Sequence, residues 1–437
     1  MSEDNSPKSR AFSLIKTLSS TALRAGNEAL KRRLNKSDEL DSFMSDAALR
    51  LVKGLDELKG AAMKVGQLLS MVDESILPPG WKSALSKLQS QATAKDWSYI
   101  EPIILKEFGN LDGFSFIEKE AVHAASIGQV HKAQLKDGTF VALKVQYPGL
   151  EKSVKSDLKN MKKLINIANF MPNMDNYDHV FDAVEMLFIQ ELDFIREKNY
   201  YDFYYEKFKN NKNIIIPKTI PEFCTKNVLT TQWIDAECLQ LWLNKNAKDI
   251  HTNPLLIEKR DKLGALLLEV VFTEIFQLNH IQSDPNPGNF LVTENADLVL
   301  LDFGATQELS SELIQNYSDL TLSAIQKNKF EIVKAAKKMG FLSRGDQPEA
   351  KESFLRAMDI AIEPFLNEKY SWKDANQLKR THAESVDFMR STKFRAPSPE
   401  VLFINRRLAG NLLIMESLGA TVFAREILNR ILNINGA

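Results

Sequence analysis

Apolar residues recur along this chain at two spacings, one typical of helices and one typical of strands. Over residues 39–72 they recur at helical intervals, which predicts one or two helices, and a shorter helix follows over 81–88. A further helix is predicted over 96–108, where Gly109 interrupts the pattern. The first quarter of the chain is therefore expected to be helical.

The next part of the chain is rich in short β-type runs. Such runs, with many β-branched and aromatic residues, occur at 114–117, 139–145 and 228–234. Asp137-Gly138 stands immediately before the second run and predicts a tight hairpin turn. Two helices are expected between the second and third runs, over 151–169 and over 178–205.

Helical spacing returns after the third run and continues to the end of the chain. The stretch 255–278 is long and mostly apolar, which predicts a buried helix. Further helices are predicted after Gly304, at 310–327, 330–338, 347–361 and 402–433. A β-rich middle followed by a long helical region predicts a protein of the α+β class.

Composition narrows the class of protein. With 437 residues the chain exceeds one ordinary core, and 44% apolar with 26% charged residues fits a water-soluble globular protein. The net charge of −1 argues against nucleic acid as a partner. The two cysteines, Cys224 and Cys238, are too few for a disulfide framework. The longest apolar stretch, 263–276, is interrupted by glutamates and is too short to cross a bilayer.

The segment 10–36 combines helical apolar spacing with many lysines and arginines. A basic amphipathic helix of this kind can lie on an anionic membrane surface. The alternative is an N-terminal helix that is mobile or docked on the protein. Because no signal peptide or transmembrane segment is visible, we expect a cytoplasmic protein, at most peripheral at the inner face of a membrane.

Chemistry is concentrated in one stretch past the middle of the chain. Asp284 is followed at short spacing by Asn289, and an apolar run then ends in Asp302-Phe303-Gly304. An Asp-Phe-Gly alone would usually mark only a strand end. Together, however, the three polar residues have the order in which kinases hold Mg²⁺ and nucleotide phosphates. Asp284 would orient or deprotonate a nucleophile, while Asn289 and Asp302 would supply hard oxygen ligands to Mg²⁺.

A lysine with a kinase-like context stands upstream of this stretch. Val141-Ala142-Leu143-Lys144 closely resembles the kinase strand whose lysine contacts the α and β phosphates. Such a lysine needs a helical glutamate to hold it. Glu191 and Glu197 are both candidates, and the sequence does not choose between them. Without the surrounding motifs, both would be read as part of a solvated helix face.

The loop before Lys144 is a degenerate phosphate loop. Compared with the kinase glycine-rich loop, it retains only the last glycine, Gly128, and the following Val130. His123 and Ala125 occupy the other two glycine positions, which would make the loop stiffer. By itself this loop would not indicate nucleotide binding.

These motifs, together with two more, resemble the UbiB/ADCK family of atypical kinase-like proteins, which is linked to ubiquinone (coenzyme Q) biosynthesis. The resemblance extends from about residue 40 to the end of the chain. Its distinctive parts are Lys64-Val65-Gly66-Gln67, which is similar to the Lys-x-Gly-Gln hallmark, the alanine-rich loop Ala124-Ala125-Ser126, and Glu191-Leu192-Asp193, which is similar to the Glu-x-Asp motif. On its own, Lys64 would be an ordinary surface lysine that shares a helix face with Gln67.

The resemblance implies a two-lobed protein-kinase-like fold with an N-terminal helical extension that caps the active site. It implies four segments: an N-terminal segment (1–38), the helical extension (39–112), the N-lobe with inserted helices (113–235) and the helical C-lobe (236–437). Lys64 would lie inside the site near Glu191 and Lys144, and Gln67 would help to seal it. Ala124, Ala125, Ser126 and Gly128 would form the nucleotide loop.

The chain departs from the family pattern at three positions. The bacterial branch has histidines where this chain has Gln282 and Asn286, so the motif looks more like that of the mitochondrial coenzyme-Q branch. The region 405–410 also resembles that branch, although no mitochondrial presequence is visible. His123 stands where the family usually has alanine, which would alter the geometry of the phosphate loop.

The resemblance implies Mg²⁺-dependent binding of ATP or ADP with slow hydrolysis, coupled to quinone or other lipid metabolism at a membrane surface. A capped site argues against phosphorylation of other proteins. Two alternatives remain: a catalytically weak pseudokinase scaffold that organises biosynthetic enzymes, and a kinase for a small metabolite. The expected partners are the nucleotide, a lipid or quinone precursor, an anionic membrane surface and biosynthetic enzymes.

Overall fold

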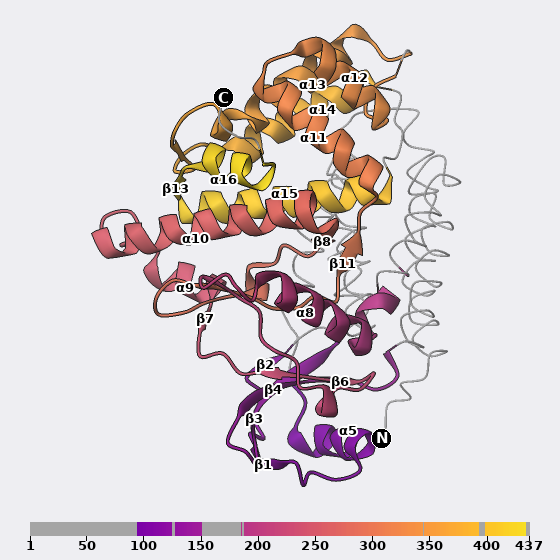
Figure 1. Ribbon diagram of the computed structural model, residues 1–437, viewed down its shortest axis with the longest axis vertical. Coiled ribbons are helices and arrows are strands. Elements are labelled where there is room, and N and C mark those ends of the chain that lie inside the picture. The colour runs from indigo at the N-terminus through magenta and orange to yellow at the C-terminus, as the bar shows by residue number, and fades with distance from the viewer. Residues whose placement is uncertain are drawn as a thin grey trace, which may run out of the picture. The chain divides into compact units, whose positions relative to one another are not determined.

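The computed structural model describes residues 94–124, 127–150, 185, 188–343, 345–392 and 398–433 (Figure 1). The chain divides into two compact units, one comprising residues 1–198 with 219–233 and the other comprising 199–218 with 234–437. The helices predicted over 39–72, 81–88 and 151–169 lie outside the described residues. No helix within the described ranges has the length and apolar character that a bilayer crossing requires.

The first unit contains an antiparallel sheet with the order β1-β3-β4-β6, and β2 pairs with β3 at the side of this path. Its strands are β1 (Phe114–Ile117), β2 (His123–Ala124), β3 (Gly128–Leu135), β4 (Phe140–Gln146) and β6 (Val228–Gln232). The predicted hairpin between β3 and β4 is confirmed. Gly138 has a φ of 91°, a left-handed conformation that glycine adopts without strain. The Thr139 amide donates to Asp137 Oδ1 at 2.8 Å and closes the turn.

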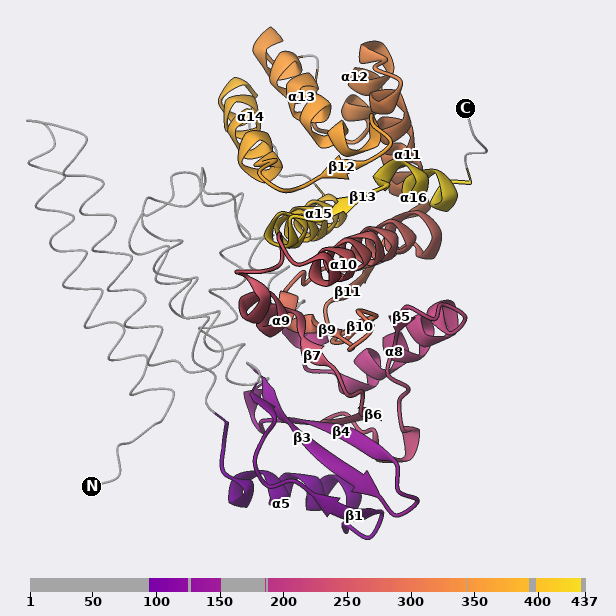
Figure 2. The same ribbon diagram turned by 90° about the vertical axis from the view of Figure 1, so that its left-hand side faces the viewer.

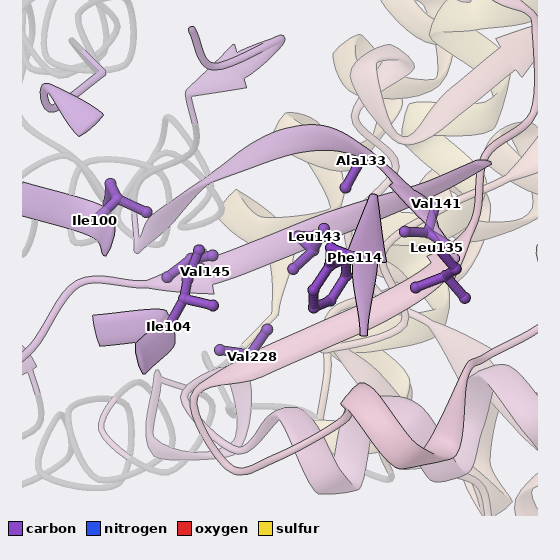
Figure 3. Close-up of a cluster of buried hydrophobic side chains, with 9 residues drawn as sticks. All are labelled: Ile100, Ile104, Phe114, Ala133, Leu135, Val141, Leu143, Val145 and Val228. Atoms are coloured by element: carbon purple, nitrogen blue, oxygen red, sulfur yellow. The ribbon is translucent and has the colours of Figure 1, made fainter. Parts of the chain in front are cut away.

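Helix α5 (Trp97–Phe108) covers one face of this sheet and ends at Gly109, as predicted. Ile100 and Ile104, one turn apart on α5, are completely buried. Figure 3 shows them beside side chains from the strands. The buried cluster consists of Ile100, Ile104, Phe114, Ala133, Leu135, Val141, Leu143, Val145 and Val228. Each large aliphatic side chain buried in it contributes about 1.5–3 kcal/mol.

A buried polar network also secures the start of α5. The Gln129 side chain bonds the Lys95 backbone, with Oε1 accepting from N at 2.7 Å and Nε2 donating to O at 3.0 Å. The Gln129 amide nitrogen lies 2.8 Å from His131 Nε2, which therefore accepts, while His131 Nδ1 donates to Glu118 O at 2.8 Å. Burial lowers the pKa of His131, and the imidazole is neutral.

The prediction of one continuous helix over 178–205 was wrong, because the helix is interrupted. Residues 188–191 are helical, the chain then breaks, and α8 (Phe194–Phe208) begins anew. Asp193 Oδ1 accepts from the amides of Ile195 at 3.0 Å and Arg196 at 3.1 Å. An aspartate that caps a helix in this way favours a new helix start over continuation of the preceding one.

The second unit is built around α10 (Pro254–Thr273), the predicted apolar helix. Asn253 caps its start, because Oδ1 accepts from the Leu255 amide at 3.0 Å. The helix continues into a π-helical turn (Glu274–Leu278), so the predicted range is confirmed with an irregular last turn. Such turns often occur where a side chain serves a function.

Short strands follow α10 and carry the polar motifs. One small sheet pairs β8 (His280–Gln282) with β11 (Thr306–Glu308) in antiparallel orientation. A second has the order β5-β10-β9-β7, with strands β5 (Ile214–Ile215), β7 (Glu237–Cys238), β9 (Phe290–Val292) and β10 (Leu298–Leu300). Asp284 therefore follows β8, and Asp302 follows β10.

Between α10 and α15 (Pro399–Leu418), the α-helices among the described residues of this unit confirm three of the predicted ranges and, with α9 (Leu239–Asn246), include two that were not predicted. The confirmed helices are α11 (Ser311–Ile325), α12 (Lys329–Lys338) and α13 (Pro348–Ala361). The unpredicted helices are α9 and α14 (Gln377–Ser391).

The single helix predicted over 402–433 was wrong. Helix α15 (Pro399–Leu418) ends at Gly419, whose φ is 61° and whose amide donates to Met415 O at 2.9 Å, a glycine stop of the usual kind. Strand β13 (Thr421–Val422) then pairs with β12 (Tyr370–Ser371), and α16 (Ala424–Ile431) follows. Figures 1 and 2 show α15 lying along α10.

Candidate functional site

The candidate residues fall into two groups, one in each unit. In the first unit, Lys144 Nζ on β4 lies 2.8 and 3.0 Å from the two carboxylate oxygens of Glu197. The side chain of Lys144 is 14% exposed and that of Glu197 only 1%. Glu197 lies in the first turn of α8, where the helix dipole favours a negative charge. The structure thus pairs Lys144 with Glu197; Glu191 lies before the break at Asp193.

The phosphate-loop residues are only partly described. Ala124 ends β2 and Gly128 begins β3. A Cβ atom on Gly128 would lie 2.2 Å from the carbonyl oxygen of Val145, so close strand packing alone requires glycine there. Ala125, Ser126, Lys64 and Gln67 lie outside the described residues, and their roles stay predictions.

In the second unit, Asn289 and Arg406 fix the side chain and backbone of Asp284. Asn289 Nδ2 donates to Asp284 O at 3.1 Å and lies 3.4 Å from its Oδ2. Arg406 Nη2, from α15, donates to Asp284 Oδ1 at 3.1 Å. Asn286, one of the departures from the bacterial pattern, accepts from the Gly288 amide at 2.9 Å and shapes the loop between Asp284 and Asn289.

Gln282 joins the loop to the strand end that carries Asp302. Its Oε1 accepts from the Asp284 amide, and its Nε2 donates to the Asp302 carbonyl, both at 2.8 Å. The Gln282 side chain is buried, so both bonds are partly shielded from water. The sequence identified Gln282 only as a departure from the bacterial histidine and did not predict this role.

Asp302 has a φ of 58°, a left-handed conformation that is uncommon for residues other than glycine. Its amide donates to the Tyr201 hydroxyl at 3.1 Å, and its Oδ1 accepts from the Gly304 amide at 3.2 Å. Phe303 is buried against the rings of Tyr201 and Tyr204. These contacts hold a strained backbone, which is often found at functional sites.

A buried ion pair supports Gln282. Glu274, in the π-helical turn, accepts from Arg407 Nε at 3.0 Å and from the Tyr204 hydroxyl at 3.1 Å. It also accepts from the backbone amide of Gln282 at 3.4 Å. Burial raises the pKa of Glu274, against the lowering effects of Arg407, Tyr204 and the Gln282 amide. Burial and the neighbouring Glu274 raise the pKa of Tyr204 well above its ordinary value, so its hydroxyl keeps its proton and donates.

The oxygen atoms of this group suit a hard cation. In the described part of the chain, Asn289 bonds through Nδ2, which leaves Oδ1 for a metal ion, and Asp302 adds a carboxylate. The same described residues contain no cluster of three or more His, Cys, Asp or Glu side chains with metal-binding geometry. Two protein ligands fit Mg²⁺, which usually keeps several waters and binds substrate phosphates.

A strand lysine held by a helical glutamate, an Asp–Asn loop and an Asp-Phe-Gly strand end define a kinase-like α+β protein. The sequence comparison specifies the family. The model of the ABC1 atypical kinase-like domain matches residues 87–336, more than half of the 437 residues. The chain therefore belongs to the ABC1 atypical kinase-like family, and both the family resemblance and the kinase-like fold predicted from the sequence are confirmed.

Three curated relatives illustrate the range of similarity. The probable serine/threonine-protein kinase abkA of Dictyostelium discoideum is 28% identical over 416 residues, which cover 90% of this chain and 72% of that protein. The mitochondrial atypical kinase COQ8 of Saccharomyces cerevisiae is 26% identical, covering 89% of this chain and 77% of that protein. The mitochondrial atypical kinase coq-8 of Caenorhabditis elegans is 28% identical, and the chain spans only 50% of its length.

A solved structure supports the fold. The complex of Rv3197 with erythromycin from Mycobacterium tuberculosis matches with a TM-score of 0.60 and 25% identity, covering 91% of this chain and 98% of that one.

Proposed function

We propose that this protein binds MgATP and either hydrolyses it slowly or transfers its γ-phosphoryl group to a small molecule. The observation that carries the proposal is the arrangement of Asp284, Asn289 and Asp302. Gln282 bonds the backbones of both aspartates, Tyr201 bonds the Asp302 amide, and the Asn289 side chain bonds the Asp284 carbonyl. A site for phosphoryl transfer works chiefly by positioning and charge, and such fixed polar groups supply both.

Each residue has a distinct part in this proposal. Lys144, held by Glu197, would contact the α and β phosphates. Asn289 and Asp302 would hold Mg²⁺, which neutralises phosphate charge when bound. Asp284 would orient the attacking water or hydroxyl.

The remaining site residues are proposed from the family motifs. Ala124, Ala125, Ser126 and Gly128 would approach the nucleotide phosphates. Lys64 and Gln67 would cover the site, which disfavours protein substrates. Glu191 would lie near Lys64 under this cover, and Glu197 would be the glutamate that pairs with Lys144.

The metabolic role is proposed to be support of ubiquinone biosynthesis or of related lipid chemistry at a membrane surface. Two of the relatives carry the names COQ8 and coq-8. The basic segment 10–36 would bind anionic lipid, and enzymes of the same biosynthesis would be partners. Because those relatives are mitochondrial by name, the cytoplasmic location expected from the sequence stays a prediction.

A second candidate is a nucleotide-binding scaffold with little turnover. One observation favours it: the carboxylate of Asp284 is already engaged by Arg406. A scaffold would bind MgATP without releasing phosphate.

The test measures thermal stabilisation by MgATP and MgADP together with phosphate release, with and without anionic liposomes. Wild-type protein is expected to be stabilised and to release phosphate slowly, and Asp302→Asn is expected to lose both responses. Asp319→Asn, in the same unit on α11 and bonded to the Gln315 amide at 2.9 Å, is the matched control. Binding without release selects the scaffold, whereas a wild type that shows neither response overturns the proposal.

A further inference from the structure

Two residues of α15 contact the loop that carries Asp284, and a third contacts Glu274, which bonds Gln282 just before that loop. Arg406 bonds Asp284 Oδ1 at 3.1 Å, and Arg407 bonds the buried Glu274 at 3.0 Å. Gly410, one turn further along, packs on Pro285. Neighbouring helical residues point about 100° apart, so one arginine can be buried while the next reaches the loop.

The contact at Gly410 sets how closely the helix approaches. A Cβ atom on this residue would lie 2.1 Å from Pro285 Cγ and 2.3 Å from Pro285 Cβ. Glycine therefore allows the backbone of α15 to touch the residue that follows Asp284. This contact fixes α15 against the loop, and the Arg407–Glu274 pair, both side chains of which are buried, fixes it against the π-helical turn that precedes the loop.

Arg406 uses this fixed position to hold one oxygen of the Asp284 carboxylate. Oδ1 accepts from the guanidinium group, while Oδ2 has only the long 3.4 Å approach of Asn289 Nδ2 within the described residues. The side chains of Arg406 and Asp284 are 23% and 22% exposed, so the group is reachable from solvent. Oδ2 is consequently the oxygen left to accept a hydrogen bond from a nucleophile.

We infer that Arg406 is a positioning residue for Asp284, and that α15 thereby contributes a residue to the proposed phosphoryl-transfer site. The guanidinium fixes the carboxylate rotamer so that Oδ2 faces the reacting hydroxyl or water. This inference rests on the function proposed above. It adds a residue that lies outside the motifs assigned to nucleotide, Mg²⁺ or base.

The test compares Arg406→Gln and Arg406→Lys with wild type in the full chain. The matched control is Arg430→Gln, which removes another arginine–carboxylate pair of the same unit; Arg430 bonds Glu269 at 2.8 Å and is 62% exposed. The measurements are kcat and KM for phosphate release from MgATP, and Kd for MgADP.

Loss of the rotamer restraint is expected to lower kcat of Arg406→Gln on the order of tenfold. KM and the MgADP Kd are expected to stay within about twofold, because the groups proposed to bind the nucleotide are intact. Arg406→Lys is expected to recover part of kcat, since it keeps the charge but not the guanidinium geometry. Arg430→Gln is expected to match wild type.

Two results overturn the inference while leaving the proposed function standing. One is an unchanged or raised kcat in Arg406→Gln. The other is a weakened MgADP Kd with unchanged kcat, which would make Arg406 a nucleotide ligand instead. Failure of the proposed function is distinguishable, because wild-type protein would then neither bind MgADP nor release phosphate.

Discussion

Gln282 and Asp302 are joined by a partly buried hydrogen bond of 2.8 Å, from the side-chain amide of the first to the backbone carbonyl of the second. The same side chain accepts from the Asp284 amide at 2.8 Å. One glutamine thus holds the backbones of the proposed base and of a proposed metal ligand. An amide can do this because it offers a donor and an acceptor side by side, and a neutral imidazole offers one of each as well.

Replacing Gln282 by leucine is expected to destabilise the protein and to lower phosphate release. The change leaves a partly buried N–H and a partly buried C=O without their partner, and the cost for each group is at most that of a fully buried one, about 1–3 kcal/mol. Gln282→His is expected to retain more of both properties. Urea unfolding and phosphate release from MgATP check the two effects.

The control is Gln240→Leu, on the exposed side of α9, where the side chain bonds only Asn244 at 3.1 Å among the described residues. This variant is expected to unfold as wild type does. If Gln282→Leu does the same, the proposed restraint by Gln282 is wrong.

Replacing Glu197 by alanine is expected to loosen the sheet of the first unit and to weaken MgATP binding. Removal of one partner from a buried ion pair costs about 3–5 kcal/mol, because a charge is left without its partner. Because the Lys144 side chain is 14% exposed, the expected loss lies at the lower end of this range, about 3 kcal/mol. Hydrogen exchange of the β3–β4 hairpin reports the opening of this sheet.

A surface pair at the C-terminal end of the same helix provides the comparison. Glu206 bonds Lys209, and both side chains are well exposed. Glu206→Ala is expected to change stability by less than about 1 kcal/mol. Equal protection of the hairpin in Glu197→Ala and Glu206→Ala would contradict the importance of the Lys144–Glu197 pair.

The sheet of the first unit is expected to lose stability in mild acid through His131. Burial lowers the folded-state pKa of this imidazole below the ordinary value of 6.5, so the unfolded chain binds a proton more readily. The contribution is complete above about pH 6.5 and is lost as the pH falls from there towards the lower folded-state pKa. Protonation would also place a donor on Nε2, opposite the Gln129 amide.

Hydrogen exchange of β3 and β4 between about pH 7.5 and 5, corrected for intrinsic rates, measures this loss. His131→Gln, which does not titrate, is expected to flatten the pH dependence. Burial, and to a smaller extent the charge of Arg260, also lowers the pKa of His251. The second unit is therefore expected to lose stability in acid as well, and a measurement of global unfolding would combine the two effects. A slope in His131→Gln equal to that of wild type would exclude His131 as its origin.

Local signals in the sequence predicted local structure well. Asp137-Gly138 predicted the β3–β4 hairpin because turn chemistry acts over a few residues. Asp193 is a local signal for a helix start, and Gly419 is one for a helix end. Neither was recognised in the sequence, because apolar residues continue at helical spacing on both sides of each. The helices over 178–205 and 402–433 were therefore predicted as continuous, although each contains a break.

Contacts between distant parts of the chain could not be predicted in this way. Glu191 and Glu197 were equivalent candidates until the break at Asp193 placed the second on Lys144, 53 positions away in the chain. The contact between Arg406 and Asp284 spans 122 positions. Nothing in the local pattern of either residue specifies the other. The order of Asp284, Asn289 and Asp302 predicted a kinase-like group, but Gln282 and Arg406, which hold it, became evident only from the fold.

The packing of α15 against the loop with Asp284, through Gly410 and Pro285, has a consequence for protein synthesis. A chain emerges from the ribosome from its N-terminus, and domains generally fold as they are completed. The loop with Asp284 is made more than a hundred residues before the helix that touches it. A nascent or prematurely terminated chain that stops short of residue 406 would also lack Arg407 and so leave the buried Glu274 without its partner. The second unit is therefore expected to stay incompletely folded, and the loop with Asp284 without its proposed restraint, until synthesis is nearly finished.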